Sequence, residues 1–527
     1  MPLTHETAIA LTLIVPFAGM VLIGLSDRNS LVRDIISVAT SLLLFSVTFW
    51  LLREVEAGAV PELILFDVMP GLSMAFKIEP LGMLFGVVAS GLWIVTALYA
   101  IGYMRGNKES HQTRFYMCFA LAISASMGIA FAANMFTLFI FYEVLTLSTY
   151  PLVAHKQNAD AKKGARTYLG ILIGTSIGFQ LLAIIWTWVA TGTLDFVHGG
   201  ILSGHLDDSF APILLALYAF GIGKAALMPF HRWLPAAMVA PTPVSALLHA
   251  VAVVKAGVFT MLKVGVYIFG IDYLSLTGAS DWLMWLAAIS IIVASVVAMT
   301  KDNLKARLAY STVSQLSYIT LAMALASSLG VMGGAMHIPM HAMGKITLFM
   351  CAGAIYVATH KTNISDMRGL GRTMPFTYAA FLIGSLSIIG LPPFGGAWSK
   401  WYILLAAADT GQLIMIGVLM VSSLLNVAYL LPVVAQGFFL PNPDEQTAPK
   451  SKGNLQSRIK EAPLLVVLPP CLTAIGCFLL FFYAQDVYNL LIPVAFGPEA
   501  AALGPDATLQ GVGSGLETAP VMLGGSN

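Results

Sequence analysis

The stretch NMFTLFIFYEVLTLSTYPLVAH, residues 134–155, decides the fold class. It is apolar enough to lie in a membrane, yet it carries Glu143 almost at its middle. A charged side chain at the centre of a bilayer costs at least about 2.5 kcal/mol. A chain that keeps a carboxylate there is expected to use it, because such residues mark ion and proton pathways in membrane proteins.

The composition of the whole chain agrees with a membrane protein. Of the 527 residues, 58% are hydrophobic and only 10% are charged, and the mean hydropathy is +0.83. A soluble domain carries about 25% charged residues. In lipid every backbone N–H and C=O must be paired within the protein, which permits only helices or closed barrels. The apolar runs lack strand-like alternation, so we predict an all-α polytopic membrane protein.

The apolar runs predict fourteen transmembrane helices. Their expected ranges are 7–25, 31–52, 79–102, 115–132, 134–154, 167–190, 211–237, 242–269, 282–299, 307–326, 330–358, 376–406, 411–437 and 463–485. Residues 438–462 form the largest connection between them. Residues 486–527, rich in Gly, Ala and Pro, are expected to be an extramembrane tail that is partly extended or disordered.

Basic residues support this count. With the 27–34 connection in the cytoplasm, 20 of the 27 Lys and Arg residues fall in cytoplasmic loops or at the cytoplasmic ends of spans. Only Arg53 and Lys77 fall in loops on the opposite face. This bias follows the positive-inside rule, and it predicts both termini on the non-cytoplasmic side of the cell membrane.

Five lysines remain inside the predicted spans, namely Lys224, Lys255, Lys263, Lys345 and Lys400. Lys263 lies near the end of its span, where a long side chain can reach the interface, whereas the other four are deep. Glu143 is the only deep acid. Burial favours the uncharged forms of both carboxylates and amines, so both can exchange protons near neutral pH. We predict a chain of proton sites with Glu143 and Lys224 as a coupled pair; static ion pairs that lock helices are the alternative.

Prolines interrupt two of the predicted spans. In GIGKAALMPFHRWLP, Pro229 follows Lys224, and in SIIGLPPFGGAWSKWY, Pro392 and Pro393 precede Lys400. Proline removes a helix hydrogen bond and breaks the helix. Interrupted spans at corresponding positions in two halves are typical of transporters with inverted repeats, although a kink needed only for packing is the alternative at each site.

Histidines and small polar residues accompany the lysines. His249 stands six residues before Lys255, which suits a relay through water, and His337, His341 and Lys345 form one helix stripe. Proton relay, hydrogen-bonded packing and metal binding are all compatible with that stripe; metal is least favoured, because no nearby Cys or acid completes a ligand set. Ser311, Thr312, Ser314 and Gln315 either hold water or bond neighbouring helices.

Several long motifs resemble a known family. FYEVLTLSTYPLV, GIGKAALMPFHRWLPAAMVAPTPVSALLHAVAVVKAG, LKARLAYSTVSQLSY, HIPMHAMGKITLFMCAG and GLPPFGGAWSKWY occur in order over about residues 75–435. They are similar to motifs of the antiporter-like subunits of respiratory complex I and of Mrp-type cation/proton antiporters, with the D-type member of the Mrp antiporter the most similar branch.

The resemblance implies fourteen helices with two inverted five-helix repeats, each containing one broken helix. The implied division is 1–114 for helices 1–3, 115–269 and 270–437 for the repeats, 438–485 for a loop and helix 14, and 486–527 for the tail. It also implies roles: Glu143 and Lys224 as the coupled pair of the first half-channel, Lys255 as the connecting lysine and Lys400 as the last station. The histidine stripe with Lys345 would connect the two halves.

The expected function is therefore proton translocation within a multisubunit Na⁺/H⁺ antiporter, as part of a secondary transporter and not as an enzyme. Other membrane subunits, H⁺ and a monovalent cation are the expected partners, and no cofactor or metal is expected. Three alternatives remain open: a proton-pumping subunit of complex I or a membrane hydrogenase, the membrane subunit of an inorganic-carbon uptake complex, and a structural scaffold. No nucleotide motif or haem or iron–sulfur pattern is present in the sequence.

Overall fold

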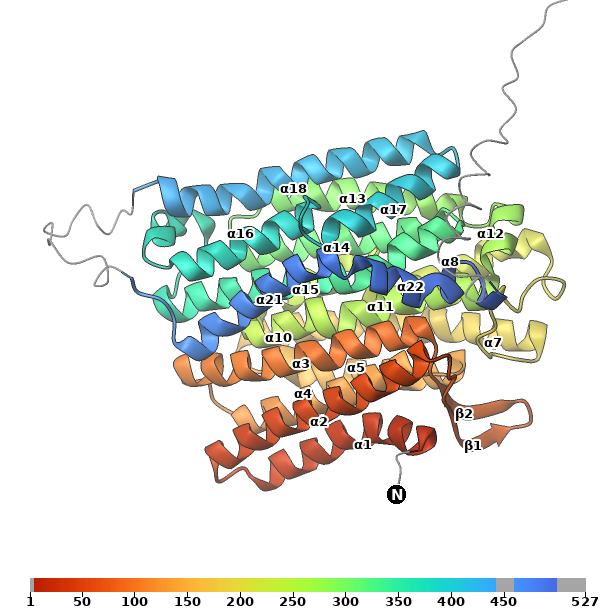
Figure 1. Cartoon of the computed structure of the whole chain (residues 1–527), viewed down its shortest axis with the longest axis horizontal. Coiled ribbons are helices and arrows are strands. Elements are labelled where there is room, and N and C mark those ends of the chain that lie inside the picture. The colour runs from red at the N-terminus through yellow and green to blue at the C-terminus, as the bar shows by residue number, and fades with distance from the viewer. Residues whose placement is uncertain (1–3, 442–458, 500–527) are drawn as a thin grey trace, which may run out of the picture.

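A computed structural model describes residues 4–441 and 459–499. Long helices run side by side along one direction, with α1 and α2 at one edge of the bundle and α18 at the opposite edge (Figure 1). The N-terminal third consists of α1 (His5–Leu25), α2 (Ser30–Glu56), α3 (Pro80–Gly106), α4 (Gln112–Ala130) and α5 (Met135–Val153). Next comes a single continuous helix built from α6 (Ala159–Thr175), the π-helical turn η1 (Ser176–Gln180) and α7 (Leu181–Thr191).

The seventh span is broken. It comprises η2 (Asp208–Phe210), α8 (Ala211–Gly221), η3 (Gly223–Ala225), η4 (Phe230–Arg232), α9 (Trp233–Ala236) and η5 (Ala237–Val239). The eighth span comprises α10 (Thr242–Ala246), the π-helical η6 (Leu247–Val251), α11 (Val253–Lys263) and the π-helical η7 (Val264–Phe269), and it is completely buried. A short helix, α12 (Ile271–Thr277), then leads to the second half.

The second half repeats this plan. It contains α13 (Asp281–Thr300), α14 (Leu304–Ala324), the 32-residue α15 (Ser328–Thr359), the broken pair α16 (Pro375–Ile389) and α17 (Gly396–Asp409), and α18 (Leu413–Phe439). Two 3₁₀ turns, η8 (Ile364–Met367) and η9 (Leu370–Arg372), lie between α15 and α16. Helices α21 (Leu464–Phe482) and α22 (Ala484–Ala495) follow, and α11 and α15 lie near the middle of the bundle (Figure 1).

The fourteen predicted spans are confirmed in the described residues. Eleven helices are long and apolar enough to cross a membrane. The other three predicted spans are α14, which carries many hydroxyl side chains, and the two broken helices. Each repeat therefore has one broken helix, while the exact domain boundaries remain a prediction.

Helix starts follow from local chemistry. Asn29, Asn134, Asn158 and Asn303 are N-cap residues whose side-chain oxygens accept backbone N–H groups of the first turn of α2, α5, α6 and α14. Such caps satisfy N–H groups that have no partner within the helix. They fix where α5, the helix of Glu143, begins.

Two elements differ from the sequence prediction. Residues 62–77 form an antiparallel hairpin of β1 (Glu62–Met69) and β2 (Leu72–Lys77), which was not predicted. The predicted tail from residue 486 is wrong in its first part, because Ala484–Ala495 is helical and buries Tyr488 and Leu491 against the bundle. Residues 500–527 and most of the predicted 438–462 loop lie outside the described residues.

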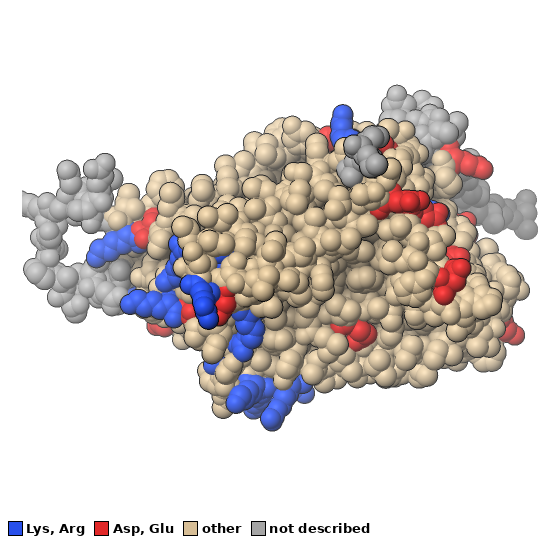
Figure 2. Space-filling view, turned by 90° about the horizontal axis from the view of Figure 1, so that it is seen from below, with Lys and Arg blue, Asp and Glu red and all other residues tan. Residues whose placement is uncertain are grey.

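Charge is distributed along the helix direction. Figure 2 shows basic side chains gathered toward one end of the visible face and acidic ones mostly toward the other. Such a bias is what the positive-inside rule leads one to expect of the two sides of a membrane protein.

Candidate proton pathway

Glu143 and Lys224 come from α5 and from the break in the seventh span. Lys224 is completely buried, and its Nζ donates to the Tyr142 carbonyl oxygen at 2.8 Å and to Thr146 Oγ1 at 2.6 Å. Both oxygens of the Glu143 carboxylate are buried and accept no hydrogen bond from a described residue. The lysine thus lies beside the chain segment of the glutamate without bonding its carboxylate.

The two members of the predicted pair, Glu143 and Lys224, are therefore not in direct contact in this structure, and their coupling stays a prediction. Across the described ranges, no ion pair within 4.0 Å joins Glu143 to Lys224. The physical reason is that a main-chain carbonyl and a threonine hydroxyl satisfy the amine before the carboxylate can. The structure shows the two groups separated.

The backbone around Lys224 does not form a regular helix. Helix α8 ends at Gly221, Ala226 has a left-handed φ of +54°, and Pro229 has no N–H to donate. The indole Nε1 of Trp233 donates to the Gly223 carbonyl oxygen at 2.9 Å, which satisfies a carbonyl freed by the break. A side chain at Gly257 would collide with the Lys224 main chain, so α11 packs directly on the break.

Lys255, the predicted connecting lysine, contacts the histidine stripe. Lys255 Nζ lies 2.7 Å from His341 Nδ1, and both side chains are buried. The rings of His341 and His337 stack with centroids 5.6 Å apart, and His337 Nδ1 lies 2.9 Å from Ser399 Oγ. Ser399 precedes Lys400, so these groups form a row from the middle of the molecule to the second break.

Lys345 belongs to a side branch. Its Nζ donates to Ser311 Oγ at 2.6 Å and approaches the Leu308 carbonyl oxygen at 3.4 Å. The Tyr429 hydroxyl also donates to Ser311 Oγ, at 2.8 Å, and contacts the Asn426 side-chain oxygen. The stripe therefore splits: its two histidines face Lys255 and Ser399, whereas Lys345 faces α14 and α18.

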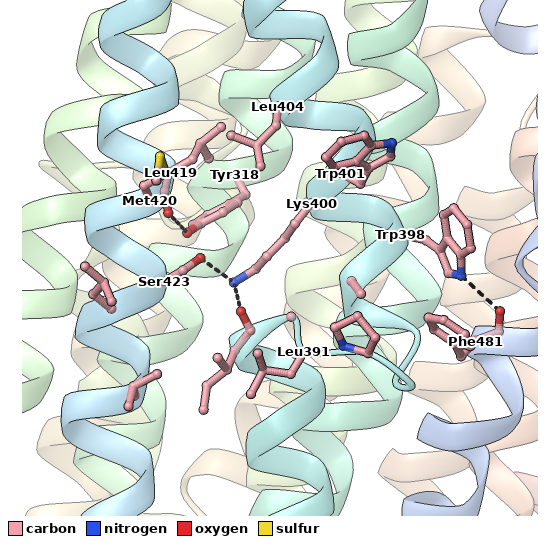
Figure 3. Close-up of a pocket in the computed structure, with 16 residues that line it drawn as sticks. Tyr318, Leu391, Trp398, Lys400, Trp401, Leu404, Leu419, Met420, Ser423 and Phe481 are labelled. Atoms are coloured by element: carbon pink, nitrogen blue, oxygen red, sulfur yellow. Dashed lines mark hydrogen bonds between the residues drawn. The ribbon is translucent and has the colours of Figure 1, made fainter.

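Lys400 lies one turn beyond the second break. Its Nζ donates to the Ile389 carbonyl oxygen at 3.0 Å and to Ser423 Oγ at 3.3 Å (Figure 3). Gly390 has a φ of +91°, and a Cβ there would meet Lys400 Cδ at 2.8 Å, so the glycine leaves room for the lysine stem. Pro392 and Pro393 lie between α16 and α17, in the turn that frees the Ile389 carbonyl.

The remaining predicted polar residues divide into two groups. His249, in η6, has neither ring nitrogen bonded to a described residue, and the side-chain amide of Gln315 likewise has no hydrogen bond to the part of the chain that the structure describes. Ser314 instead shares a hydrogen bond of 2.9 Å with Ser295, so it joins α14 to α13. The Thr312 hydroxyl donates to the Leu308 carbonyl oxygen of its own helix. Unpartnered buried polar atoms are where ordered water is found in proteins.

The side chain of Lys263 lies in a different environment from the one predicted. It does not reach the interface, because it is buried in an ion pair with Glu79 and lies over the rings of Phe196 and Tyr267. Glu79 is the N-cap residue of α3, outside the predicted set of deep acids. Nothing in the sequence pointed to this partner, because residues 79 and 263 belong to distant segments.

Several residues that contact this network were also missed. Tyr142, Thr146 and Ser423 bond lysine amines, Ser399 bonds His337, and Tyr429 bonds Ser311. Hydroxyl residues one or two helical turns from a deep charge are the sequence signal that would have found Thr146. As for metals, within residues 4–441 and 459–499 no group of three or more His, Cys, Asp or Glu side chains is placed to hold an ion.

This arrangement of broken helices and buried lysines has relatives. The family model described as "NADH:quinone oxidoreductase/Mrp antiporter, TM" matches residues 132–426. The chain belongs to this family. It is an antiporter-like, multi-pass membrane protein of a multisubunit complex, as the motifs predicted.

Two curated relatives mark two branches of the family. The chain is 32% identical over 440 residues to the N subunit of the NADH-quinone oxidoreductase of Desulforudis audaxviator, covering 81% of this chain and 85% of the relative. It is also 32% identical over 417 residues to the A/B subunit of a probable K(+)/H(+) antiporter of Rhizobium meliloti, covering 77% of this chain but only 40% of that longer protein.

The fold matches a solved structure of an antiporter complex. A chain of the Mrp complex from Dietzia sp. DQ12-45-1b superposes with a TM-score of 0.80, covering 94% of this chain and 99% of that chain, at 22% identity. Similar proteins are thus members of multisubunit membrane assemblies.

Proposed function

We propose that this chain is the proton-translocating subunit of a multisubunit Na⁺/H⁺ antiporter in the cell membrane, with both termini on the non-cytoplasmic side. One observation carries the proposal: Lys255, His341, His337 and Ser399 form a buried row that leads to Lys400. Apolar side chains would pack this interior better than a row of amines and imidazoles bonded to neutral groups. Packing alone therefore does not explain the row.

The chemistry of the row suits proton transfer. Burial favours the uncharged form of an amine, and an amine beside an imidazole can pass a proton through one hydrogen bond. Each transfer moves one proton and leaves the donor one charge lower and the acceptor one charge higher. The row of Lys255, His341 and His337 therefore carries protons without moving helices.

Glu143 and Lys224 supply the switch. In the separated arrangement, Lys224 bonds Tyr142 and Thr146 while the carboxylate has no described partner. Two unit charges 4 Å apart attract by about 4 kcal/mol at an effective dielectric constant of 20. Forming and breaking the direct pair would therefore load and release a proton at the first break.

Proton uptake is expected at the basic end of the molecule. A cavity of about 170 Å³ there is lined by residues that include Lys156, Lys305 and Thr242. Thr242 begins α10, the helix that leads to His249, and its hydroxyl approaches that of Tyr103 at 3.4 Å. The cavity thus adjoins the start of the central span.

The relative named as an NADH-quinone oxidoreductase component favours a second candidate, a redox-driven proton pump. In that case the same row of residues works within an enzyme complex, and no Na⁺ is exchanged. The membrane component of an inorganic-carbon uptake complex is a third use of the fold, identified by a large soluble zinc-protein partner.

Two measurements separate these functions. Mass spectrometry of the gently solubilised native complex identifies the partners: small hydrophobic subunits support the antiporter, and flavin or iron–sulfur proteins support the redox pump. In proteoliposomes of that complex, Glu143→Gln is expected to assemble normally and to lose Na⁺-driven proton flux, whereas the exposed Glu62→Gln keeps it. Normal flux in Glu143→Gln would contradict the mechanism, and loss of assembly would indicate a scaffold.

A further inference from the structure

A groove lies beside the second broken helix, between α16, α17, α18 and α21. Its volume is about 660 Å³, and Lys400, Trp401 and Leu424 are among its lining residues (Figure 3). Ligand sites in proteins usually have volumes of about 300–1,000 Å³. The groove therefore has the size of a small-molecule site.

The wall of the groove is hydrocarbon-like and open on one side. Trp401 and Leu424 are 53% and 69% exposed, so the groove reaches the surface that the bundle presents to the membrane. Trp398 donates its indole N–H to the Phe481 carbonyl oxygen at 3.0 Å, so this polar group is already satisfied. Such a wall favours an alkyl chain.

Lys400 is the exception in this wall. It is only 7% exposed, and its Nζ donates to two neutral oxygens, those of Ile389 and Ser423. An ammonium has three donors. Among the residues that the structure describes, none forms an ion pair with Lys400 within 4.0 Å. In its ammonium form Lys400 therefore has one N–H donor left over. Such a group in an apolar groove is complementary to an acid brought by a ligand.

The depth of Lys400 restricts the ligand. Helix α16 has 15 residues and is thus about 22 Å long. Lys400 lies beyond it, in the first turns of α17 (Gly396–Asp409), with about 14 Å of helix still to follow. The hydrocarbon core of a bilayer is about 30 Å thick. A phospholipid phosphate, held at the headgroup level, is poorly placed for this lysine, whereas a carboxylic acid enters the hydrocarbon in its neutral form.

We propose that this groove binds one long-chain carboxylic acid, with the carboxyl group on Lys400 Nζ and the alkyl chain along Trp401 and Leu424. When the neutral acid meets the uncharged amine, its O–H bond breaks and an N–H bond forms. The resulting carboxylate and ammonium have the same net charge as the two neutral groups, so no net charge is buried. This binding stands apart from the proton-transfer proposal, since a binding assay detects it without any transport.

Tryptophan fluorescence of the purified full-length chain in its native complex tests the proposal. 9,10-Dibromostearic acid is the probe, because bromine on an alkyl chain quenches nearby indoles. We expect saturable quenching by the acid, and an apparent affinity at least about tenfold lower for its methyl ester, which corresponds to about 1.4 kcal/mol. The chain has nine tryptophans, so Trp398→Phe/Trp401→Phe identifies the part of the quenching that arises in the groove.

Lys400→Met is expected to bind the acid no better than the ester, while Lys77→Met, which removes an exposed lysine, keeps the preference. Equal quenching by acid and ester in the unaltered protein would overturn the proposal, because the groove would then accept any alkyl chain. Absence of groove quenching in the complex would overturn it too, because a partner helix would then cover the site. The comparison of acid with ester does not depend on Lys400→Met, so it decides the matter even if that variant fails to assemble.

Discussion

The two broken helices place similar lysines in different surroundings. Lys224 is completely buried, and a carbonyl and a threonine of α5 hold its amine. Lys400 sits at the inner wall of a groove that opens toward the membrane, and its amine bonds a carbonyl and a serine at longer distances of 3.0 and 3.3 Å. In both cases a main-chain carbonyl accepts a bond from the amine, so a neutral backbone oxygen holds each lysine in the same way.

The difference shows how one element can do two tasks. At the first break Lys224 is completely buried, which suits a switch that must exclude other solutes. At the second break the amine is reachable from the bilayer side, which suits a terminal station that exchanges protons or contacts a ligand. The following predictions test this contrast, from the largest expected effect to the smallest.

The strongest test replaces each lysine by alanine. Lys224→Ala and Lys400→Ala are both expected to reduce proton flux in proteoliposomes at least about tenfold, the factor that corresponds to 1.4 kcal/mol of lost stabilisation. A lipophilic primary amine such as octylamine should restore part of the flux in Lys400→Ala only, because only that site is open to the bilayer. Rescue of Lys224→Ala, or of neither variant, would break the contrast.

A second test concerns the ion pair that we regard as static. Glu79→Gln leaves Lys263 buried without its partner, and removing one partner of a buried pair costs about 3–5 kcal/mol. We expect a markedly lower unfolding temperature of the purified chain in detergent. Glu79→Leu/Lys263→Met should recover most of the stability and retain proton flux. Full stability of Glu79→Gln with lost flux would instead place this pair on the proton pathway.

The row between the two breaks offers a third test. His341→Leu removes the hydrogen-bond partner of Lys255 and should lower proton flux by about tenfold, which is below the roughly 10²–10⁴-fold contribution of a general acid or base in enzymes. His205→Leu, in an exposed loop, is the matched control and should have no effect. Unchanged flux in His341→Leu would mean that protons bypass the histidines.

The smallest effects distinguish the hydroxyl partners. Thr146→Val leaves a donor of Lys224 unsatisfied in a sealed site, which costs about 1–3 kcal/mol, whereas Ser423→Ala leaves Lys400 beside an open groove. About 1.4 kcal/mol of activation free energy corresponds to a tenfold change in rate. Initial rates of proton flux should therefore fall several-fold in Thr146→Val and less than about twofold in Ser423→Ala. The reverse order would mean that Lys400 is the more enclosed of the two lysines.

The sequence allowed a good prediction of the spans and a partial prediction of the site. Long apolar runs and proline positions report directly on helices and breaks, because lipid leaves the backbone few alternatives. The hairpin at 62–77 and helix α22 were missed, since short elements outside the main spans lack that constraint. Lysine partners were harder, because main-chain carbonyls such as that of Tyr142 have no signature in a sequence, and pairs such as Glu79 and Lys263 depend on tertiary contacts.

Proton flux driven by a Na⁺ gradient, with no electron donor present, is the measurement that tests the central proposal most directly. The native complex is sealed in proteoliposomes that contain a pH-sensitive dye, as the unaltered protein and as Lys255→Met. The proposal predicts that an imposed Na⁺ gradient changes the internal pH with the unaltered protein and does not with Lys255→Met. Flux that persists in Lys255→Met, or that requires an electron donor, would contradict it.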